Sequence, residues 1–381
     1  MSEDVYIVGT DMTRFGRYPN RTVEDIGAEA ADLAMADAGL AIGDMQAFYC
    51  GNQGDAGGRV GQRVMRQLGQ TGIPVVNVSN ACATGATAFR EAWIAVKSGL
   101  YDTVLALGCE QMGRGLLGVP MSYGGVVTEG LVGSATQPAA FAMLGMELTR
   151  KHGITFEQYA KVSVKNHHHA TLNPKAMYRK ETPLYEVMNA EMIAYPLTKL
   201  MCSVNVDGAA AAVLCSEARA RQLGLMDRAV RVRASALTSD PFTPQNLAFV
   251  DFNAVTRLAA GQAYETAGIG PEEIDLVELH DCFATAELLH YENLGLCSEG
   301  GSGELIDSGE TQLGGRLPVN VSGGLLSKGH PLGATGIANI YEVVTHLRGE
   351  AGARQVEGAR IGMTHVVGAG SACAIHILEK V

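Results

Sequence analysis

The chain has 381 residues, of which 47% are hydrophobic and 18% charged, so it can form a sizeable core and is not globally disordered. Its net charge of −11 would repel nucleic-acid backbones and anionic membrane surfaces, which argues against a nucleic-acid or membrane-surface role. No apolar run approaches the roughly 20 residues that span a bilayer, and eight cysteines without regular pairing predict buried thiols in a reducing cytoplasm.

The first half of the chain alternates short apolar runs with helical patterns. In chain order we expect a strand over residues 5–9, a helix over 22–38, strands near 45–50 and over 75–78, a helix over 86–96 and a strand over 103–108. This alternation predicts an α/β fold in which helices cover a mixed or parallel sheet.

The alternation stops between Gly113 and about Cys202, and the second half has no counterpart to this stretch. We interpret it as an inserted subdomain, where ligand contacts often lie. It includes three consecutive histidines, 167–169. Adjacent helical residues point in different directions, so these side chains cannot share one metal ion, and a solvated or partly packed helix is expected.

The second half repeats the order of the first. We expect a helix over 258–267, a strand over 274–279, helices over 284–294 and after Gly329, and a strand over 359–367. Both halves have Ala-Thr-Gly at the start of a helix, and residues 208–217 resemble residues 370–379. These matches in one order indicate an internal repeat. Two such halves usually pack about a pseudo-twofold axis, which brings equivalent helix N-termini to one site.

Cys82 is the first chemical candidate, because it lies where a strand gives way to a helix. Helix N-terminal N–H groups stabilise a thiolate, so we expect a lowered pKa. The alternative is a small buried cysteine without function. His330 lies in a Gly/Pro-shaped loop at the equivalent place in the second half, so it is a candidate base for Cys82. Its alternative is a helix-capping histidine.

His280 and Cys282 directly follow the strand at 274–279, at the strand end where α/β folds place ligands. A second thiol and a second imidazole suit proton transfer at carbon beside an acylated cysteine. A zinc site is the rival interpretation, which we disfavour because the two residues are so close in sequence and no CxxC exists. No phosphate-binding glycine loop or Walker motif is present, which argues against redox and nucleotide-hydrolysis functions.

Three motifs together resemble the thiolase superfamily, and most closely its sterol-carrier-protein type. They are residues 79–85 (Ser-Asn-Ala-Cys-Ala-Thr-Gly), 280–283 (His-Asp-Cys-Phe) and 329–336 (Gly-His-Pro-Leu-Gly-Ala-Thr-Gly). The resemblance covers essentially the whole chain. It implies the thiolase fold, with two pseudo-twofold-related βαβαβαββ halves in a layered α/β sandwich. The implied parts are 1–116 with 203–224, an inserted loop domain at 117–202 that covers the substrate, and 225–381.

The resemblance also implies a mechanism. Cys82, deprotonated with help from His330, would carry the acyl group, and Cys282 would move the α-carbon proton, since Val366 stands where better-known thiolases have a second cysteine. His280 and His330 would hold the thioester oxygen, and the backbone N–H groups of Cys82 and Gly368 would form a second oxyanion hole. Coenzyme A would be substrate and product, with no permanently bound cofactor and no metal. Candidate contacts to its phosphates are Lys175, Arg179 and Lys180.

Two rivals stay open: a decarboxylating condensing enzyme of the ketoacyl-synthase type, and a non-catalytic acyl-CoA-binding subunit. The first shares the Ala-Cys-Ala-Thr-Gly sequence but usually has His-Gly-Thr in place of residues 280–282. The resemblance further implies a homodimer paired through the strand at 75–78, with a small zinc-ribbon/OB-fold protein as an additional candidate partner. Neither a signal peptide, a targeting signal nor a fused sterol-carrier domain is expected. The sequence leaves the acyl chain and the physiological direction open.

Overall fold

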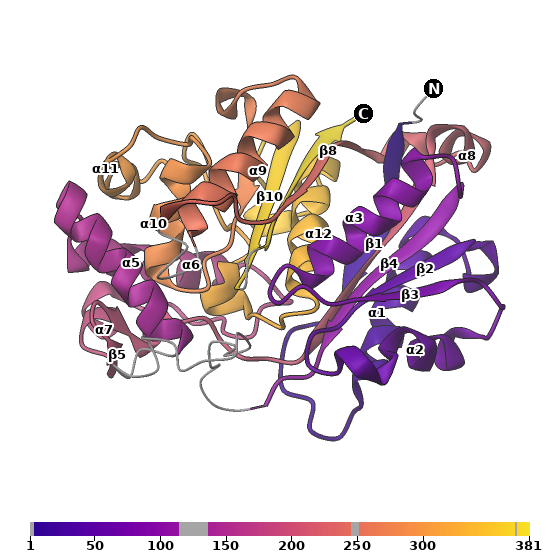
Figure 1. Ribbon diagram of the computed structural model, residues 1–381, viewed down its shortest axis with the longest axis horizontal. Coiled ribbons are helices and arrows are strands. Elements are labelled where there is room, and N and C mark those ends of the chain that lie inside the picture. Colours follow the sequence, from indigo (N-terminus) through magenta and orange to yellow (C-terminus); the bar gives the residue numbers. More distant parts are fainter. Residues whose placement is uncertain (1–3, 114–135, 245–250, 370–371) are drawn as a thin grey trace.

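The computed structural model describes residues 4–113, 136–244, 251–369 and 372–381. Its main sheet has nine strands in the order β3-β2-β4-β7-β1-β8-β11-β10-β9 (Figure 1). The strands of the first half are β1 (Val5–Met12), β2 (Ala47–Gly51), β3 (Val75–Val78), β4 (Thr103–Glu110) and β7 (Gly208–Ser216). Those of the second half are β8 (Val230–Thr238), β9 (Leu276–Glu278), β10 (Ile361–Gly368) and β11 (Ala372–Lys380).

The sheet topology confirms the internal repeat. Counted outward from the contact between β1 and β8, the first half runs β1-β7-β4-β2 and the second runs β8-β11-β10-β9. In each half the two pairings nearest the centre are antiparallel, and the outer pairing, β4 with β2 or β10 with β9, is parallel. The first half carries β3 as an additional edge strand. The halves join where β1 and β8 pair antiparallel, at Tyr6 with Arg231 and Ile7 with Val230.

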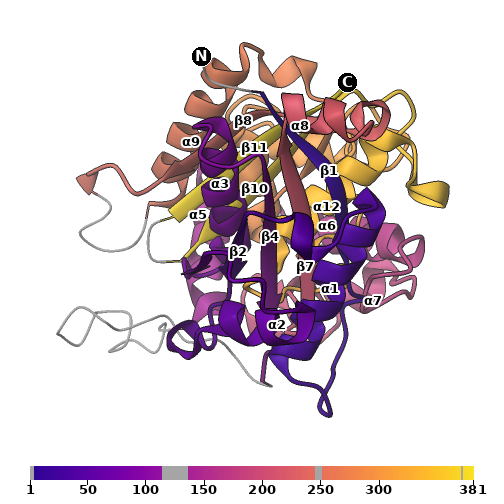
Figure 2. The same ribbon diagram turned by 90° about the vertical axis from the view of Figure 1, so that its right-hand side faces the viewer.

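The helices form layers on both sides of this sheet. The helices of the two halves are α1 (Val23–Ala38), α2 (Val60–Leu68), α3 (Thr84–Lys97), α8 (Glu217–Gln222), α9 (Phe252–Ala267), α10 (Ala284–Asn293), α11 (Ser302–Asp307) and α12 (Thr335–Arg348). Helices α3 and α12 pack together in the middle of the molecule (Figures 1 and 2), with α1 and α2 on the outer face of the first half and α9 and α10 on that of the second.

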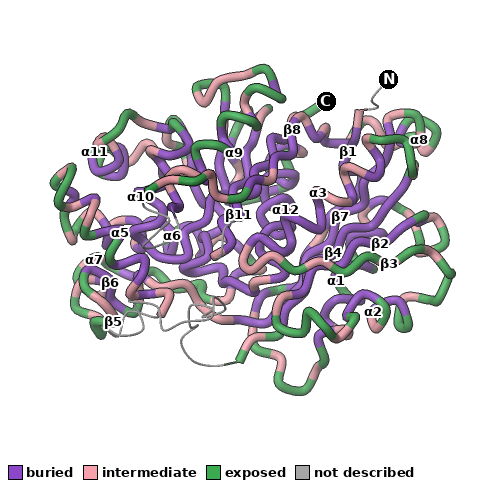
Figure 3. Tube along the Cα trace, in the orientation of Figure 1, coloured by how far each residue is buried: buried purple, intermediate pink, exposed green. Residues whose placement is uncertain are grey.

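Alternation along the strands explains this layering. On β1, Val5 and Ile7 belong to the central core with α3 and α12, whereas Tyr6 and Val8 belong to the core under α1 and α2. Both faces of the strand are therefore buried, as Figure 3 shows for most of the sheet. Successive side chains point to opposite faces of a strand, so a continuous apolar run supplies two cores. The predicted layered α/β sandwich is confirmed.

The two central helices approach so closely that glycine is required at their N-termini. A Cβ on Gly85 of α3 would lie 2.5 Å from the carbonyl oxygen of Gly333, and one on Gly336 of α12 would lie 2.3 Å from the backbone nitrogen of Ala86. No side chain fits at such distances. The shared Ala-Thr-Gly therefore brings the first turns of α3 and α12 into contact, as the repeat predicted.

Helix boundaries follow the sequence signals closely. Thr22 caps α1 in a reciprocal hydrogen-bond pair with Asp25, and Gly39 ends that helix at a φ of 66°. Gly268 ends α9 in the same way, also at a φ of 66°. The predicted strand at 274–279 is shorter than expected, because β9 comprises only the three residues that pair with β10.

The inserted segment lies between β4 and β7, whereas β10 and β11 are separated by only three residues. Its elements are α5 (Gln137–His152), α6 (Phe156–Thr171), α7 (Leu184–Met188), β5 (Met192–Ala194) and β6 (Leu197–Thr198). Part of it, residues 114–135, lies outside the described residues, and the exact boundaries at 116/117 and 202/203 stay a prediction. No helix in the described part of the chain is both long and apolar enough to cross a membrane.

Candidate active site

Cys82 lies on a strained turn between β3 and α3. The preceding residue, Ala81, has a φ of 49°, in the left-handed region that non-glycine residues rarely adopt. Two side chains hold this turn. The Gln53 side-chain oxygen accepts the N–H of Ala81 at 2.9 Å, and the Thr84 hydroxyl donates to the Ala81 carbonyl at 2.6 Å. The thiol is thus presented just before the first turn of α3, as the sequence predicted.

The expected lowering of the Cys82 pKa is wrong. Burial raises the pKa of this thiol to about 12 and outweighs the hydrogen bonds from the backbone amides of Ala369 and of Cys82 itself. The negative charge of Glu110 acts in the same direction as burial. Desolvation penalises a thiolate more than the helix N-terminus favours it. In the resting site Cys82 is therefore a neutral thiol.

His330 is held by the first residue of α12. The Thr335 hydroxyl donates to the Pro331 carbonyl at 3.0 Å, so its oxygen accepts the Nδ1–H of His330 at 2.8 Å. This assigns the proton of the imidazole to Nδ1 and leaves a lone pair on Nε2, which is buried and has no partner among the described residues. Burial, aided by His280 and Lys328, lowers the pKa of His330 well below 6.5. The ring is therefore neutral and available as a base.

The prediction that His330 occupies the place equivalent to Cys82 is only approximately right. Counted back from the first residues of the two helices, Cys82 lies two residues before Thr84, but His330 lies five residues before Thr335. The repeat places Gly333 opposite Cys82. His330 thus lies three residues further from its helix than Cys82 does, but its imidazole still comes within 4.8 Å of the Cys82 sulfur.

His280 completes a trio with these residues. The Cys82 sulfur and one ring nitrogen each from His280 and His330 all lie within 4.8 Å of one another. The two imidazoles meet edge to face, with ring centroids 5.3 Å apart. Burial lowers the pKa of His280 to about 3, so it too is neutral. Its backbone N–H donates to Nδ1 of the buried His365 at 3.3 Å.

The trio opens into a cavity of about 320 Å³ that the Cys282 thiol also lines. Burial raises the pKa of Cys282 well above its usual value, and negative charge on the neighbouring Cys82 would raise it further. The remaining lining is mostly apolar and includes Phe141 and Val367. The structure therefore brings together all four predicted catalytic side chains. Cys373, in contrast, is buried within β11 near Thr256 and does not line this cavity.

Asp281, between His280 and Cys282, ties the two second-half motifs together. One carboxylate oxygen accepts the N–H of Leu325 at 2.8 Å, and the other accepts Nδ2 of Asn166 from the inserted helix α6 at 2.8 Å. The same amide nitrogen donates to the buried Glu287, which forms an ion pair of 2.8 Å with Lys165. A buried network therefore fixes the catalytic turn, the segment leading to His330 and the inserted segment to one another.

Glu110, at the end of β4, joins the two halves at the site. Its buried carboxylate accepts backbone N–H groups of Gln53, Gly54 and Gly333, at 3.0 to 3.1 Å. Sequence reasoning missed this residue, although its place at the carboxyl end of a central strand was a usable signal. Asn166 and Lys165 gave no signal, because the sequence does not reveal which polar and charged residues are buried.

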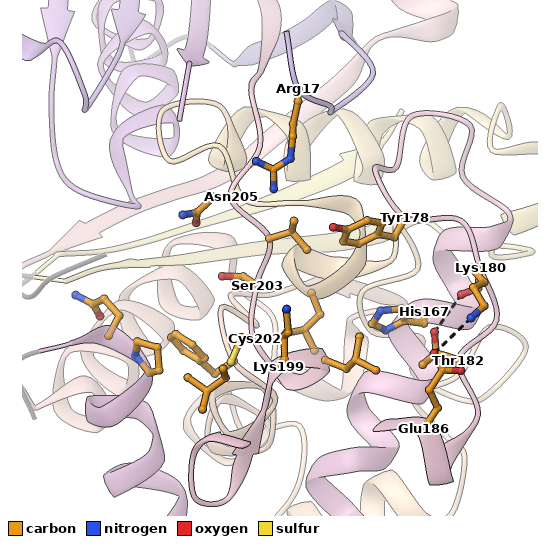
Figure 4. Close-up of a pocket in the computed structure, with 17 residues that line it drawn as sticks. Arg17, His167, Tyr178, Lys180, Thr182, Glu186, Lys199, Cys202, Ser203 and Asn205 are labelled. Carbon is orange, nitrogen blue, oxygen red and sulfur yellow. Dashed lines mark hydrogen bonds and ion pairs between the residues drawn. The ribbon is translucent and has the colours of Figure 1, made fainter. Parts of the chain in front are cut away.

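A second cavity of about 670 Å³ adjoins the first, and Gln137, Ser203 and Phe283 line both. Figure 4 shows the Arg17 guanidinium entering it from above and Lys180 beside Glu186 at its edge. Lys199 lines it as well. It is the larger of the two cavities, and its lysine and arginine side chains make it the more basic one.

Of the three lysine and arginine residues predicted to hold phosphates, only Lys180 lines this cavity. Lys175 instead forms an ion pair with Asp11 and lies over the Tyr341 ring. Arg179 reaches the Thr171 carbonyl at 3.5 Å on the surface. Both have local partners that the sequence pattern does not show, and neither lines this cavity, so their contact with the phosphates stays a prediction.

The remaining predicted residues are placed as follows. Gly368 ends β10 against the Cys82 turn, because a Cβ there would lie 2.6 Å from the carbonyl oxygen of Asn80. His167 and His169 are buried and bond the carbonyls of Ser163 and Asn320, whereas His168 is exposed. The helix that carries the three histidines is therefore partly packed, one of the two arrangements expected.

Comparisons with known proteins match both halves. Residues 5–191 match the family model for the thiolase N-terminal domain, and residues 245–380 match that for the thiolase C-terminal domain-like family. Sterol carrier protein 2 of Bos taurus is 40% identical over 98% of this chain and 72% of its own length. An acetyl-CoA acetyltransferase of Methanothermobacter thermautotrophicus is 41% identical over 99% of this chain and 100% of its own length.

Among solved structures, the one named Ltp2-ChsH2(DUF35) aldolase has a TM-score of 0.85. It is 24% identical to this chain and the match covers 100% of this chain and 98% of that one. At this identity the likeness concerns the fold.

Proposed function

The chain belongs to the thiolase family and is an acyltransferase, and we propose that it cleaves a 3-oxoacyl-CoA with free CoA, or forms one by condensation, through an acyl group carried on Cys82. The observation that carries the proposal is the trio of Cys82, His280 and His330 within 4.8 Å, at a cavity that Cys282 also lines. A nucleophile beside its base and a second thiol is what carbon–carbon acyl transfer requires.

In the first step Cys82 attacks the substrate carbonyl while Nε2 of His330 takes the thiol proton. The hydrogen bond from Nδ1 to Thr335 leaves that nitrogen free for the purpose. Because both groups are neutral at rest, the proton moves as the sulfur–carbon bond forms, rather than in a preformed ion pair. The backbone N–H groups of Cys82 and Gly368 are proposed to stabilise the oxyanion, with the amide of Ala369, which already bonds the sulfur, as an additional donor.

In the carbon–carbon step Cys282 exchanges a proton with the α-carbon, and His280 and His330 hold the thioester oxygen on which enolate charge develops. The raised pKa of Cys282 suits this task, since a protonated thiol can deliver a proton to the enolate released by cleavage. In condensation the Cys282 thiol first releases its own proton to solvent, and the resulting thiolate then takes the proton from the α-carbon.

The larger cavity is the proposed CoA site, and the inserted segment forms much of its wall. It adjoins the cysteine cavity through Gln137, Ser203 and Phe283, so a pantetheine arm can pass from one to the other. Arg17, Lys180 and Lys199 are the proposed phosphate contacts, because they are the cations that line it. Of these three proposed phosphate contacts, Lys180 is also predicted from the sequence.

A panel of 3-oxoacyl-CoA thioesters assayed with free CoA tests the function and identifies the acyl chain. We expect consumption of CoA and release of two acyl-CoA products without CO₂. Turnover that required a malonyl thioester and released CO₂ would favour the ketoacyl-synthase alternative. Failure of every thioester to acylate Cys82 would favour a non-catalytic acyl-CoA-binding subunit.

We also propose a homodimer paired through β3. This strand forms one edge of the sheet, and its central residue Val76 is 40% exposed. An apolar, β-branched residue on a free edge suits pairing with a second copy. Light scattering should give at least twice the chain mass at micromolar concentration, and a monomer mass would reject the dimer.

A small zinc-ribbon/OB-fold protein stays a proposed additional partner. The solved structure named Ltp2-ChsH2(DUF35) aldolase, which has the same fold as this chain, supports this proposal. We keep the cytoplasm as the proposed location, because all eight cysteines are unpaired.

A further inference from the structure

The Cys82, His280 and His330 trio has the composition of a cation site. Three donor atoms, one sulfur and two imidazole nitrogens, come from three separate segments and lie within 4.8 Å of one another. Within the described ranges it is the one such group of three metal-ligating side chains found. One thiolate with two imidazoles is a donor set that tetrahedral Zn²⁺ accepts, and catalytic zinc sites commonly have three protein ligands with a fourth position open to water.

The distances suit such an ion after a small contraction. Zinc–sulfur and zinc–nitrogen bonds of about 2.3 and 2.0–2.1 Å place two ligand atoms of one tetrahedron about 3.5 Å apart. The trio, whose longest separation is within 4.8 Å, therefore needs to close by roughly 1 Å on that side. Side-chain rotation supplies a movement of this size without rearranging the backbone.

The hydrogen bonds around the trio leave it ready to bind. Nδ1 of His330 donates to Thr335, which donates in turn to the Pro331 carbonyl, so the lone pair of Nε2 is free. Metal-ligating histidines typically have their other nitrogen held by such an acceptor. Nε2 of His330 and Nδ1 of His280 are both buried without a partner in the described part of the chain. Buried polar atoms without a partner call for a ligand or water.

Negative charge beside the trio also favours a cation. When the ion binds, the Cys82 thiol releases its proton to solvent and the sulfur becomes a thiolate ligand. The buried carboxylate of Glu110 acts electrostatically on the same sulfur. The thiolate and Glu110 offset the positive charge of the ion, which limits the cost of burying it.

We propose that this trio is a reversible inhibitory site for Zn²⁺, which binds Cys82, His280 and His330 and withholds the nucleophile from acyl-CoA. The ion is not a cofactor for turnover. This inference goes beyond the proposed acyl-transfer function, because it requires only the geometry of the three side chains.

Cadmium titration of the reduced, metal-free full chain tests the site through thiolate-to-metal charge-transfer absorption. We expect one tight equivalent per chain, which one equivalent of Zn²⁺ displaces and which prior acetylation of Cys82 prevents. Cys82→Ser should remove that equivalent, and His330→Gln should weaken its binding by at least about 10-fold, as loss of a ligand does. Circular dichroism establishes that each variant is folded.

Two matched controls separate the trio from other donors. Cys373→Ser removes a buried thiol outside the cavity, and His168→Asn removes an exposed imidazole; both should keep the tight equivalent. The proposal is overturned if Cys82→Ser retains it with unchanged affinity, or if the wild-type chain takes up no tight cadmium. Because the readout is spectroscopic, it can fail while thiolysis stands, and it can succeed where no 3-oxoacyl-CoA is cleaved.

Discussion

Helices α3 and α12 both begin at the threonine of a shared Ala-Thr-Gly, yet the turns before them present different chemistry. Thr84 and Thr335 both donate their hydroxyl back to a carbonyl of their own turn, at Ala81 and Pro331. Thr84 accepts the backbone N–H of Asn80, whereas Thr335 accepts the Nδ1–H of the His330 imidazole. The first turn thus shapes a backbone that carries a nucleophile, and the second orients a base. One duplicated helix start has acquired two roles through the residues placed before it.

Replacing His330, the proposed base, should have the largest effect on the acylation of Cys82. His330→Ala should slow acylation of Cys82 by about 10²–10⁴-fold, the usual contribution of a general acid–base group. In the proposed mechanism His330 takes the proton of this thiol, whose pKa is about 12. Single-turnover acylation with acetyl-CoA measures the rate. A wild-type rate would mean that another group, with His280 the first candidate, is the base.

Cys282→Ala should separate the two half-reactions. Acylation by a simple acyl-CoA needs only the first turn and His330, so it should continue. Condensation, thiolysis of a 3-oxoacyl-CoA and exchange of the acetyl-CoA methyl protons with D₂O should each fall about 10²–10⁴-fold. His280→Ala should slow the same carbon chemistry less, since His330 still faces the oxygen. Near-normal proton exchange in the Cys282 variant would contradict its role.

The matched threonines allow a direct test of their different functions. Thr335→Val removes the acceptor of the His330 Nδ1–H, so the tautomer is no longer fixed and acylation should slow about 10-fold, which corresponds to one hydrogen bond of about 1.4 kcal/mol. Nitrogen NMR of the His330 ring should report the change, and Thr335→Ser should restore both rate and spectrum. Thr84→Val should leave the ring signals unchanged. If the His330 ring signals are the same in the wild-type chain and in Thr335→Val, the assigned hydrogen bond is refuted.

The buried histidines of the second half and Cys82 of the first should also govern opposite ends of the pH–stability profile. Burial holds the pKa of His280 and His290 at about 3, below the unfolded value of 6.5, so their contribution is present above pH 6.5 and is lost as the pH falls towards 3. The pKa of Cys82 is raised from 9.0 to about 12, so its contribution is present below pH 9 and is lost as the pH rises towards 12. Each group contributes at most about 1.4 kcal/mol per pH unit.

Urea unfolding across pH measures these slopes. His290→Phe should make the acid limb shallower, Cys82→Ala should make the alkaline limb shallower, and His168→Asn, at an exposed imidazole, should change neither. If His290→Phe left the acid slope intact, its imidazole would not be the buried neutral group described.

Much of this arrangement could be predicted from the sequence because the repeat fixes topology. Ala-Thr-Gly in both halves placed the two helix starts together, and His280, Cys282 and His330 followed from motifs at strand and helix ends. The electrostatics could not be predicted in this way. Whether burial or the helix N-terminus dominates at Cys82 depends on solvent access, which is a property of the folded chain. The same holds for Asn166 and Lys165, whose partners lie more than 100 residues away, and for Lys175, which Asp11 draws from the cavity.

Intact-mass analysis with acetyl-CoA, followed by peptide mapping, tests the central claim most directly. The wild-type chain should gain the mass of one acetyl group, located on the peptide that contains Cys82. Cys82→Ala should gain none while keeping its unfolding transition. An adduct that persists in this variant and maps to Cys282 or another cysteine would contradict the assignment of the nucleophile.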